Sequence, residues 1–291
     1  MIQYNPKDWF TFIFRLHKAD TVRKLMPLII GIAIYALIIA LLEKEVWEML
    51  DNNYVKNIPL MHGMLGFVIS LLLVFRTNTA YDRWWEGRKL WGALTNNCRN
   101  LAIKLSAMLP ESEIEHRIFF RKIIPAYAYA LKNHLGHEST ATEIFDDEEL
   151  NKQIHHDKHV PNQVALLMTK HINTIYKENK ITGEQLITLN NEIQTFTDIC
   201  GACERIKNTP IPFSYSVFLK KFIFFYVMTL PFGYVFSMGY WVIPVVAFIF
   251  YVLASLELIA EEIEDPFGAD SNDLPTGKMA QNIQRHVAEI I

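Results

Sequence analysis

The chain has 291 residues, of which 51% are hydrophobic and 20% charged, and its formal net charge is −3. A negative balance argues against a nucleic-acid-binding protein, because such proteins present dense lysine and arginine on one face. The three cysteines are too few for a disulfide framework and fit a reducing compartment. The N-terminus lacks a short cationic region followed by an apolar run and a cleavage site, so we expect no signal peptide. Mean hydropathy is nevertheless slightly positive, so the apolar residues must be concentrated in blocks.

Those blocks form candidate membrane helices. Residues 25–42 and 57–75 contain no charged side chain, and a third uncharged run covers 222–256. Because a bilayer core of ~30 Å takes roughly 20 helical residues, the third run is too long for one span. Gly233 and Gly239, with a proline nearby, supply a break, so we interpret this run as a tight hairpin. The sequence therefore predicts four transmembrane helices, at about 25–43, 57–76, 214–236 and 239–259.

Basic residues predict the orientation of these spans. The first 24 residues hold five lysines or arginines and residues 76–89 hold four, whereas the loop between the first two spans holds only two. Loops rich in lysine and arginine stay on the cytoplasmic side. We therefore expect a multi-pass protein of the cell inner (plasma) membrane, in contact with the lipid bilayer, with both termini and the middle region in the cytoplasm.

The middle region, about 77–212, is predicted to be helical. Two apolar stripes recur at spacings of three and four, as on one face of a helix. The first consists of Leu90, Leu94, Cys98, Leu101, Leu105 and Met108, and the second of Leu186, Leu189, Ile193, Phe196 and Ile199. The polar stretch 137–163 is expected to be a loop or short surface helices. The predicted fold class is therefore an all-α membrane protein, with residues 1–291 as a single domain that ends in a C-terminal segment, 261–291.

Three stretches resemble the signature sequences of bacterial bestrophins: FRTNTAYDRWWEGRKLWG (75–92), CERIKNTPIPFSY (203–215) and EDPFGADSNDLPTGKM (264–279). Their order and their places relative to the spans match that family over nearly the whole chain. The resemblance implies a homopentameric ion channel with one central pore, no enzyme chemistry, and small inorganic ions as permeant partners. Animal members are calcium-activated anion channels, and some bacterial relatives favour cations, so the selectivity does not follow from the fold.

In bestrophins the second span lines a hydrophobic neck with apolar residues four apart, and a narrow apolar ring closes a pore by dewetting it. Counting back from the Phe-Arg pair that begins the first signature places this pattern on Leu60, Met64 and Val68. At 100° per residue, five apolar residues share one ~100° arc. The candidate pore neck is Leu60, Met64, Phe67, Val68 and Leu71.

Two alternatives to this neck remain open. A register counted from Gly66 and Phe67 would choose Pro59, Gly63 and Phe67, which form a poor seal. The apolar arc also suits contact with lipid or with a neighbouring helix, as any apolar face in a membrane does.

Polar residues in and beside the second span form a further set of candidates. His62 lies ~200° around the helix from Leu60. A membrane histidine is a functional candidate that titrates near neutral pH, although such residues often pack against a neighbouring helix or subunit. Arg76 and Arg83 are interpreted as structural, pairing with acidic groups of EDPFG across a subunit boundary. Pro212 is expected to rigidify the entry to the third span.

The resemblance also implies a cytoplasmic constriction near KITGEQ (180–185), formed by Ile181 or Glu184. A ring of Glu184 carboxylates would favour cations, whereas a ring of Ile181 side chains would select by size.

Acidic residues crowd the chain after the fourth span, where six of the thirteen residues from Glu261 onward are carboxylates. Calcium needs six or more hard oxygens on a loop that can bend. In animal bestrophins such a loop clasps calcium, and the resemblance places carboxylates of Asp270 and Asp273 there, with backbone carbonyls of Glu262 and Asp265. The alternative is that these groups bind basic residues of an adjacent subunit. No cofactor is required, and calcium is the one candidate.

A rival hypothesis is a membrane-anchored metal-binding protein. The HHDKH stretch places His155 and His159 one helical turn apart with Asp157 close by, and His134 and His137 would complete a zinc site of three or four ligands. A polar surface segment explains the same residues more simply.

Two further rivals have less support. The pair Cys200 and Cys203 has the spacing of a redox motif but no thioredoxin-like context, so we interpret it as packing. A small-solute transporter would show internal repeats and discontinuous helices, and neither is visible.

Overall fold

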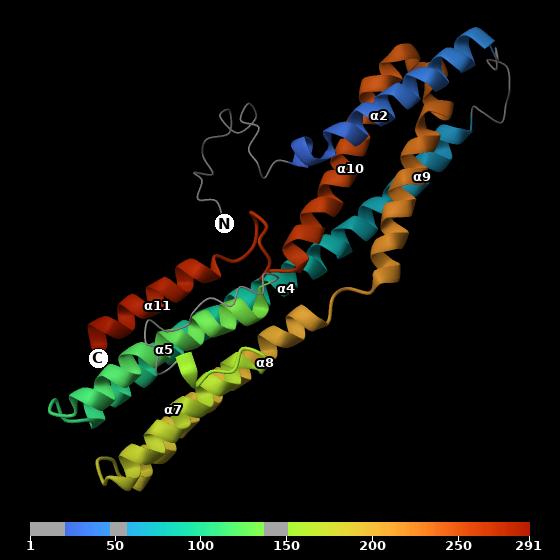
Figure 1. Cartoon of the computed structure of the whole chain (residues 1–291). Helices are drawn as coiled ribbons and strands as arrows, with labels where there is room; N and C mark the ends of the chain where they lie inside the picture. Colours follow the sequence, from blue (N-terminus) through green and yellow to red (C-terminus); the bar gives the residue numbers. More distant parts are fainter. Residues whose placement is uncertain (1–20, 47–56, 137–150) are drawn as a thin grey trace. The chain divides into compact units, whose positions relative to one another are not determined.

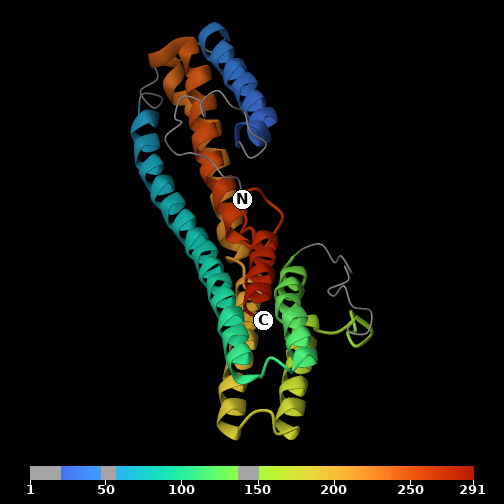
Figure 2. The ribbon, with the colours of Figure 1, turned by 90° about the vertical axis from the view of Figure 1, so that its left-hand side faces the viewer.

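The computed structural model describes residues 21–46, 57–136 and 151–291, and within these ranges every regular element is a helix. The predicted all-α class is therefore confirmed. The chain divides into two compact units, which are drawn in Figures 1 and 2. The membrane unit comprises Ile2–Asp82 and Pro210–Glu264, and the bundle unit comprises Arg83–Thr209 and Asp265–Ile291. The prediction of one domain over the whole chain stays a prediction.

The membrane unit holds the most apolar helices of the described chain. Three stretches are long and apolar enough to cross a membrane: Thr21–Glu45, Ile58–Met108 and Phe213–Glu264. The first contains α2 (Thr21–Leu41) and a π-helical turn (Leu42–Val46), and α2 packs against α10, as Figure 1 shows. The chain is therefore a multi-pass membrane protein, and its crossing four times stays a prediction.

The last apolar stretch contains two helices, as the sequence predicts, and the break lies within a few positions of the predicted one. Helix α9 covers Phe213–Met238, a 3-10 turn covers Gly239–Trp241, and α10 covers Val242–Glu264. Gly239 adopts a φ of 58°, which L side chains rarely adopt, and so permits the reversal. Gly233 lies inside α9.

Helix α4 (Ile58–Met108) is a continuous helix of 51 residues. It begins in the membrane unit and ends in the bundle unit. The predicted second span, 57–76, therefore continues into the helical middle region without a break. Likewise, α9 begins directly after Pro212, as expected from the fixed φ of proline.

Close backbone approach and hydrogen bonds hold the membrane unit together, as expected where lipid competes for apolar contact. A Cβ on Gly233 would lie 2.7 Å from Cγ2 of Ile58, so α9 and α4 meet closely there. The hydroxyl of Tyr35 in α2 donates to the carbonyl of Met228 in α9 at 2.9 Å. An apolar core of α2, α4, α9 and α10 residues fills the rest, including Ile69 and Leu73 of α4.

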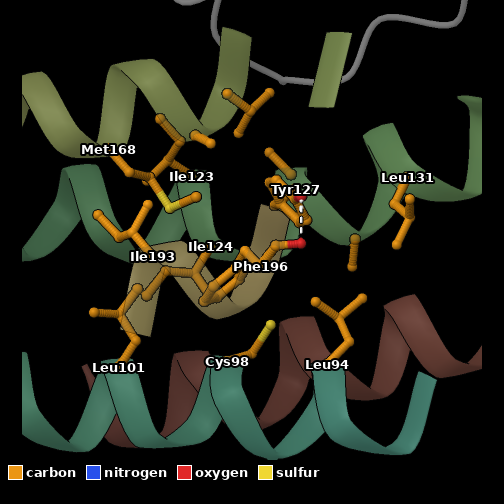
Figure 3. Packing of buried hydrophobic residues seen from close by; sticks show 14 of the residues in the cluster. Leu94, Cys98, Leu101, Ile123, Ile124, Tyr127, Leu131, Met168, Ile193 and Phe196 are labelled. Atoms are coloured by element: carbon orange, nitrogen blue, oxygen red, sulfur yellow. Dashed lines mark hydrogen bonds between the residues drawn. The ribbon is translucent and has the colours of Figure 1, made fainter. Parts of the chain in front are cut away.

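The bundle unit packs the second half of α4 with α5 (Ile114–Leu135), α7 (Val160–Lys177), α8 (Gly183–Asn208) and α11 (Thr276–Ile290). Figure 2 shows α7 and α8 as a hairpin joined by a short turn. Both predicted apolar stripes face this core, in which Leu94, Cys98, Leu101, Ile193 and Phe196 meet α5 (Figure 3). The buried hydroxyl of Tyr127 donates to the carbonyl of Phe196 at 2.8 Å.

One predicted loop is partly wrong. The polar stretch 137–163 was expected to be a loop or short surface helices, yet α7 begins within it at Val160. Its side-chain cap is His159 and a proline stands in its first turn, where the missing N–H costs nothing. Residues 137–150, including His137, lie outside the described residues.

Candidate functional site

The predicted neck residues form a continuous exposed face on α4. All five are large and apolar, yet each is exposed in the described chain. Their exposed fractions are 72% for Leu60, 68% for Met64, 71% for Phe67, 43% for Val68 and 45% for Leu71. A shallow apolar hollow on this face is lined by Pro59, Leu60, Gly63, Met64, Phe67 and Val68. Both registers considered from the sequence therefore contribute to one surface.

The opposite face of α4 is the packed one. Its buried residues are His62, Ile69, Leu73, Arg76 and Ala80. At 100° per residue this stripe is centred ~170° from the predicted neck. The helix thus packs on its own chain with one side and presents the neck residues outward with the other.

His62 belongs to the packed face. Its Nδ1 lies 3.0 Å from the carbonyl of Ile58 and its Nε2 lies 2.9 Å from the hydroxyl of Thr229 in α9. The rings of Tyr226 and Tyr234 lie beside it. Of the two interpretations of this residue, the structure favours packing against a neighbouring helix of the same chain.

Arg76 is 1% exposed and anchors the membrane unit. Its Nη2 donates to Glu264 at 2.7 Å, and its Nε lies 3.5 Å from a carboxylate oxygen of Glu257. Glu264 also accepts from the backbone N–H of Ile211, which leads into α9. The predicted contact of Arg76 with the EDPFG segment is therefore confirmed, but this partner, Glu264, is in the same chain and not across a subunit boundary.

Arg83 binds backbone carbonyl groups of the bundle unit. Its guanidinium donates to the carbonyls of Ile206 and Thr209. These carbonyls end α8, where a cation compensates the exposed backbone oxygens. These contacts support the structural role that the sequence predicts for Arg83, and its pairing with EDPFG stays a prediction.

The acidic segment 265–274 is a compact loop of the bundle unit. Asp273 is buried, and its Oδ2 accepts from the backbone N–H of Asp270 at 2.5 Å, whereas the Asp270 side chain is exposed. The loop packs on α4 at Gly87, where a Cβ would lie 3.2 Å from Phe267. The indole N–H of Trp84 donates to the carbonyl of Asn272.

The four predicted calcium ligands are divided between the units. Asp265, Asp270 and Asp273 are in the bundle unit, and Glu262 is in the membrane unit, where its carboxylate contacts Lys24 at 2.5 Å. The backbone carbonyls, the one exposed carboxylate and the buried one are hard oxygen donors, which is the type that calcium prefers.

The two candidates for the cytoplasmic constriction differ in exposure. Ile181 is 5% exposed and belongs to the core of the bundle unit, so its side chain cannot line an opening in this arrangement. Glu184 is exposed in the first turn of α8. Hydrogen bonds from Thr182 and from its own backbone N–H hold the pKa of Glu184 below its usual range, so the carboxylate is ionised at neutral pH. Glu184 is the better placed of the two.

The histidine-rich motif contributes one residue to a cluster. His159, His134 and Glu204 form a group whose possible ligand atoms all lie within 4.8 Å of one another. His155 and Asp157, which the sequence placed beside His159, are not in this group. Glu204 follows the CGAC motif. The sequence did not predict it as a ligand, because nothing in its local spacing links α8 to the histidines.

The cysteines are packing residues, as predicted. All three are buried and free. Burial raises the pKa of both Cys200 and Cys203 to about 12, so neither forms a reactive thiolate at neutral pH.

Comparisons with known proteins agree over nearly the whole chain. A family model described as bacterial/fungal bestrophin protein matches residues 1–289. A protein of Nostoc sp. named voltage-dependent anion channel-forming protein is 33% identical over 294 residues, which is 98% of this chain and 92% of the relative. A Synechocystis sp. protein with the same description is 35% identical over 245 residues, or 82% and 80%. The crystal structure of a bacterial bestrophin homolog from Klebsiella pneumoniae superposes with a TM-score of 0.81 at 28% identity and covers 92% of this chain and 98% of that one.

Proposed function

The chain belongs to the bacterial and fungal bestrophin family, and we propose that it assembles as a homopentamer that conducts small monovalent ions through one central pore. The names of its relatives and the bestrophin structures that it resembles support an ion channel rather than an enzyme. The subunit number and the single pore come from the family resemblance.

The exposed apolar face of α4 carries this proposal. Leu60, Met64 and Phe67 are each about seven-tenths exposed on a helix whose opposite face is fully packed. Copies of this face around a common axis would form a narrow apolar neck. Such a neck excludes water and thereby resists ions, since an ion gives up its hydration shell reluctantly.

The charge of the permeant ion depends on groups outside the neck, because the neck itself is uncharged. The relatives are named anion channel-forming proteins, which supports anions. A ring of exposed, ionised Glu184 side chains would favour cations instead. We propose small monovalent ions as the permeant class.

The orientation remains part of the proposal. Arg23 and Lys24 stand at the start of α2, and basic residues follow the second span in α4, which supports cytoplasmic termini in the inner membrane. Fusion of a reporter that is active only in the cytoplasm to either terminus checks this assignment.

Recording from purified protein in planar bilayers under a salt gradient tests the function. We expect discrete passive currents with a stable reversal potential, whose sign identifies the permeant ion. A transporter would instead require a second solute to drive flux. Folded protein that passes no ion under any gradient would contradict the channel.

We further propose that the 265–274 loop binds calcium through the Asp270 carboxylate, with loop carbonyls completing the oxygen donors. The change Asp270→Asn removes the charge but leaves the backbone N–H that holds Asp273. We expect calcium bound by the purified protein to fall by about one ion per chain, because this is the loop's one exposed ligating carboxylate. Asp157→Asn, at an exposed aspartate outside the loop, is the control, and undiminished calcium in Asp270→Asn would contradict the site.

A further inference from the structure

We propose that His134, His159 and Glu204 bind one divalent transition-metal ion, of which zinc fits best. The three residues come from separate segments: the last turn of α5, the cap of α7 and the body of α8. They are the one group of three or more such residues found within the described ranges. The site lies inside the bundle unit and has no role in the conduction proposed above.

The geometry converges on one point. The Nε2 atoms of His134 and His159 each lie 2.6 Å from the same oxygen, Oε1 of Glu204. The two imidazole rings lie 4.4 Å apart between centroids. Zinc bonds of ~2.0–2.2 Å in a tetrahedron require neighbouring ligand atoms roughly 3.3 Å apart. Small outward shifts of these side chains would therefore open room for the ion.

The donor set selects the kind of metal. Two imidazoles and one carboxylate suit zinc and its first-row neighbours, whereas calcium and magnesium prefer oxygen throughout. The side chains of His134, His159 and Glu204 are about a third exposed, at 31%, 32% and 27%, so water can complete the coordination. Burial opposes ionisation of Glu204, but hydrogen bonds from His159 and His134 outweigh it and lower its pKa, so the carboxylate is available to a cation at neutral pH.

The helix-capping contact of His159 competes with metal binding, so metal binding should change a measurable property of α7. The Nδ1 of His159 accepts the backbone N–H of Asn162 at 3.1 Å and caps α7, so without metal the ring proton is on Nε2. A metal on Nε2 moves that proton to Nδ1, which can then no longer accept from Asn162. The loss of this cap hydrogen bond weakens metal binding several-fold. Metal binding in turn loosens the first turn of α7.

The test uses the full chain in detergent, purified without a polyhistidine tag and stripped with a chelator. Zinc is titrated against a chromophoric competitor, with magnesium as the negative arm. We expect one tightly bound zinc per chain and no response to magnesium. The changes His134→Ala and Glu204→Gln should weaken zinc binding by at least about tenfold, since loss of even an outer partner costs 10- to 100-fold.

The change His159→Asn separates the two roles of His159. Asparagine is among the best helix caps, so it keeps α7 intact while removing the imidazole. It should lose zinc affinity like the other two variants without a lower melting temperature. His156→Ala, at an exposed neighbouring histidine outside the group, should bind zinc as the parent chain does.

Hydrogen exchange at Asn162 supplies the second readout, and zinc should accelerate it. Zinc affinity that is unchanged in His159→Asn and Glu204→Gln would overturn the site, as would a parent chain that takes up no zinc. Zinc binding that leaves exchange at Asn162 unchanged would overturn the assignment of His159 as a ligand.

Discussion

Several buried ionisable side chains in the described chain contact neighbouring helices of the same chain. His62 and Arg76 lie on the packed face of α4 and contact Thr229 and Glu264 respectively. In the bundle unit, Nδ1 of His116 lies 3.0 Å from Nε2 of His171. Unpaired polar groups in such places are costly, and these contacts reduce that cost.

The pair His116–His171 predicts how stability depends on pH. Burial, followed by the nearby His116, lowers the pKa of His171 from 6.5 to about 4. Between these values the unfolded chain binds a proton that the folded chain does not, so stability falls as the pH is lowered from 6.5 to 4 and the effect levels off below. We expect the melting temperature to decline over this window.

The change His171→Gln keeps a hydrogen-bonding side chain but removes the titration, so its decline should be shallower than that of the parent chain. His156→Ala, at an exposed histidine, should leave the decline as it is. An identical pH slope for His171→Gln and the parent chain would show that His171 does not titrate as described.

Residue roles differed in how far the sequence could predict them. The family resemblance placed the neck on the second span and helical periodicity grouped its residues on one face, and Leu60, Met64 and Phe67 are all exposed on that face. Glu204 could not be found in this way, because its neighbours His134 and His159 are 70 and 45 residues away in the chain. Only the packing of three helices brings them together.

At the scale of elements, charge-free length and apolar spacing predicted the helices well. The residues of α2, α4 and α9 agree with the predicted spans to within a few positions at most ends, apart from the continuation of α4 beyond the span. The break between α9 and α10 was also predicted to within a few positions, although the two glycines near it serve different purposes. Gly239 provides a positive φ, whereas Gly233 provides space for α4. Composition alone does not distinguish these uses.

This difference predicts opposite effects for the same substitution. Gly233→Ala places a Cβ 2.7 Å from Ile58, whose branched side chain cannot easily move. We therefore expect the free energy of unfolding to fall by about 1–3 kcal/mol. Gly31→Ala in α2 meets nothing within 4 Å, so alanine should gain up to about 1 kcal/mol from its higher helix propensity. Thermal melts of both variants in detergent check this, and a Gly233→Ala protein as stable as Gly31→Ala would contradict the close approach.

For the whole molecule, the family membership and the exposed face of α4 both favour an assembly of several copies around a pore. A single chain leaves Leu60, Met64 and Phe67 uncovered. Sequence periodicity could locate this face but not its occupant, because lipid and a second copy of the chain are both apolar. A direct measurement of the pore distinguishes these two occupants.

Single-channel recording of Met64→Ala is that measurement, with Met26→Ala on an exposed position of α2 as its matched control. If copies of the α4 face surround the pore, the smaller side chain widens the neck and raises the conductance several-fold, while Met26→Ala leaves it unchanged. A Met64→Ala protein that assembles normally and carries the same unitary current as the parent chain would contradict the neck and place this face against lipid.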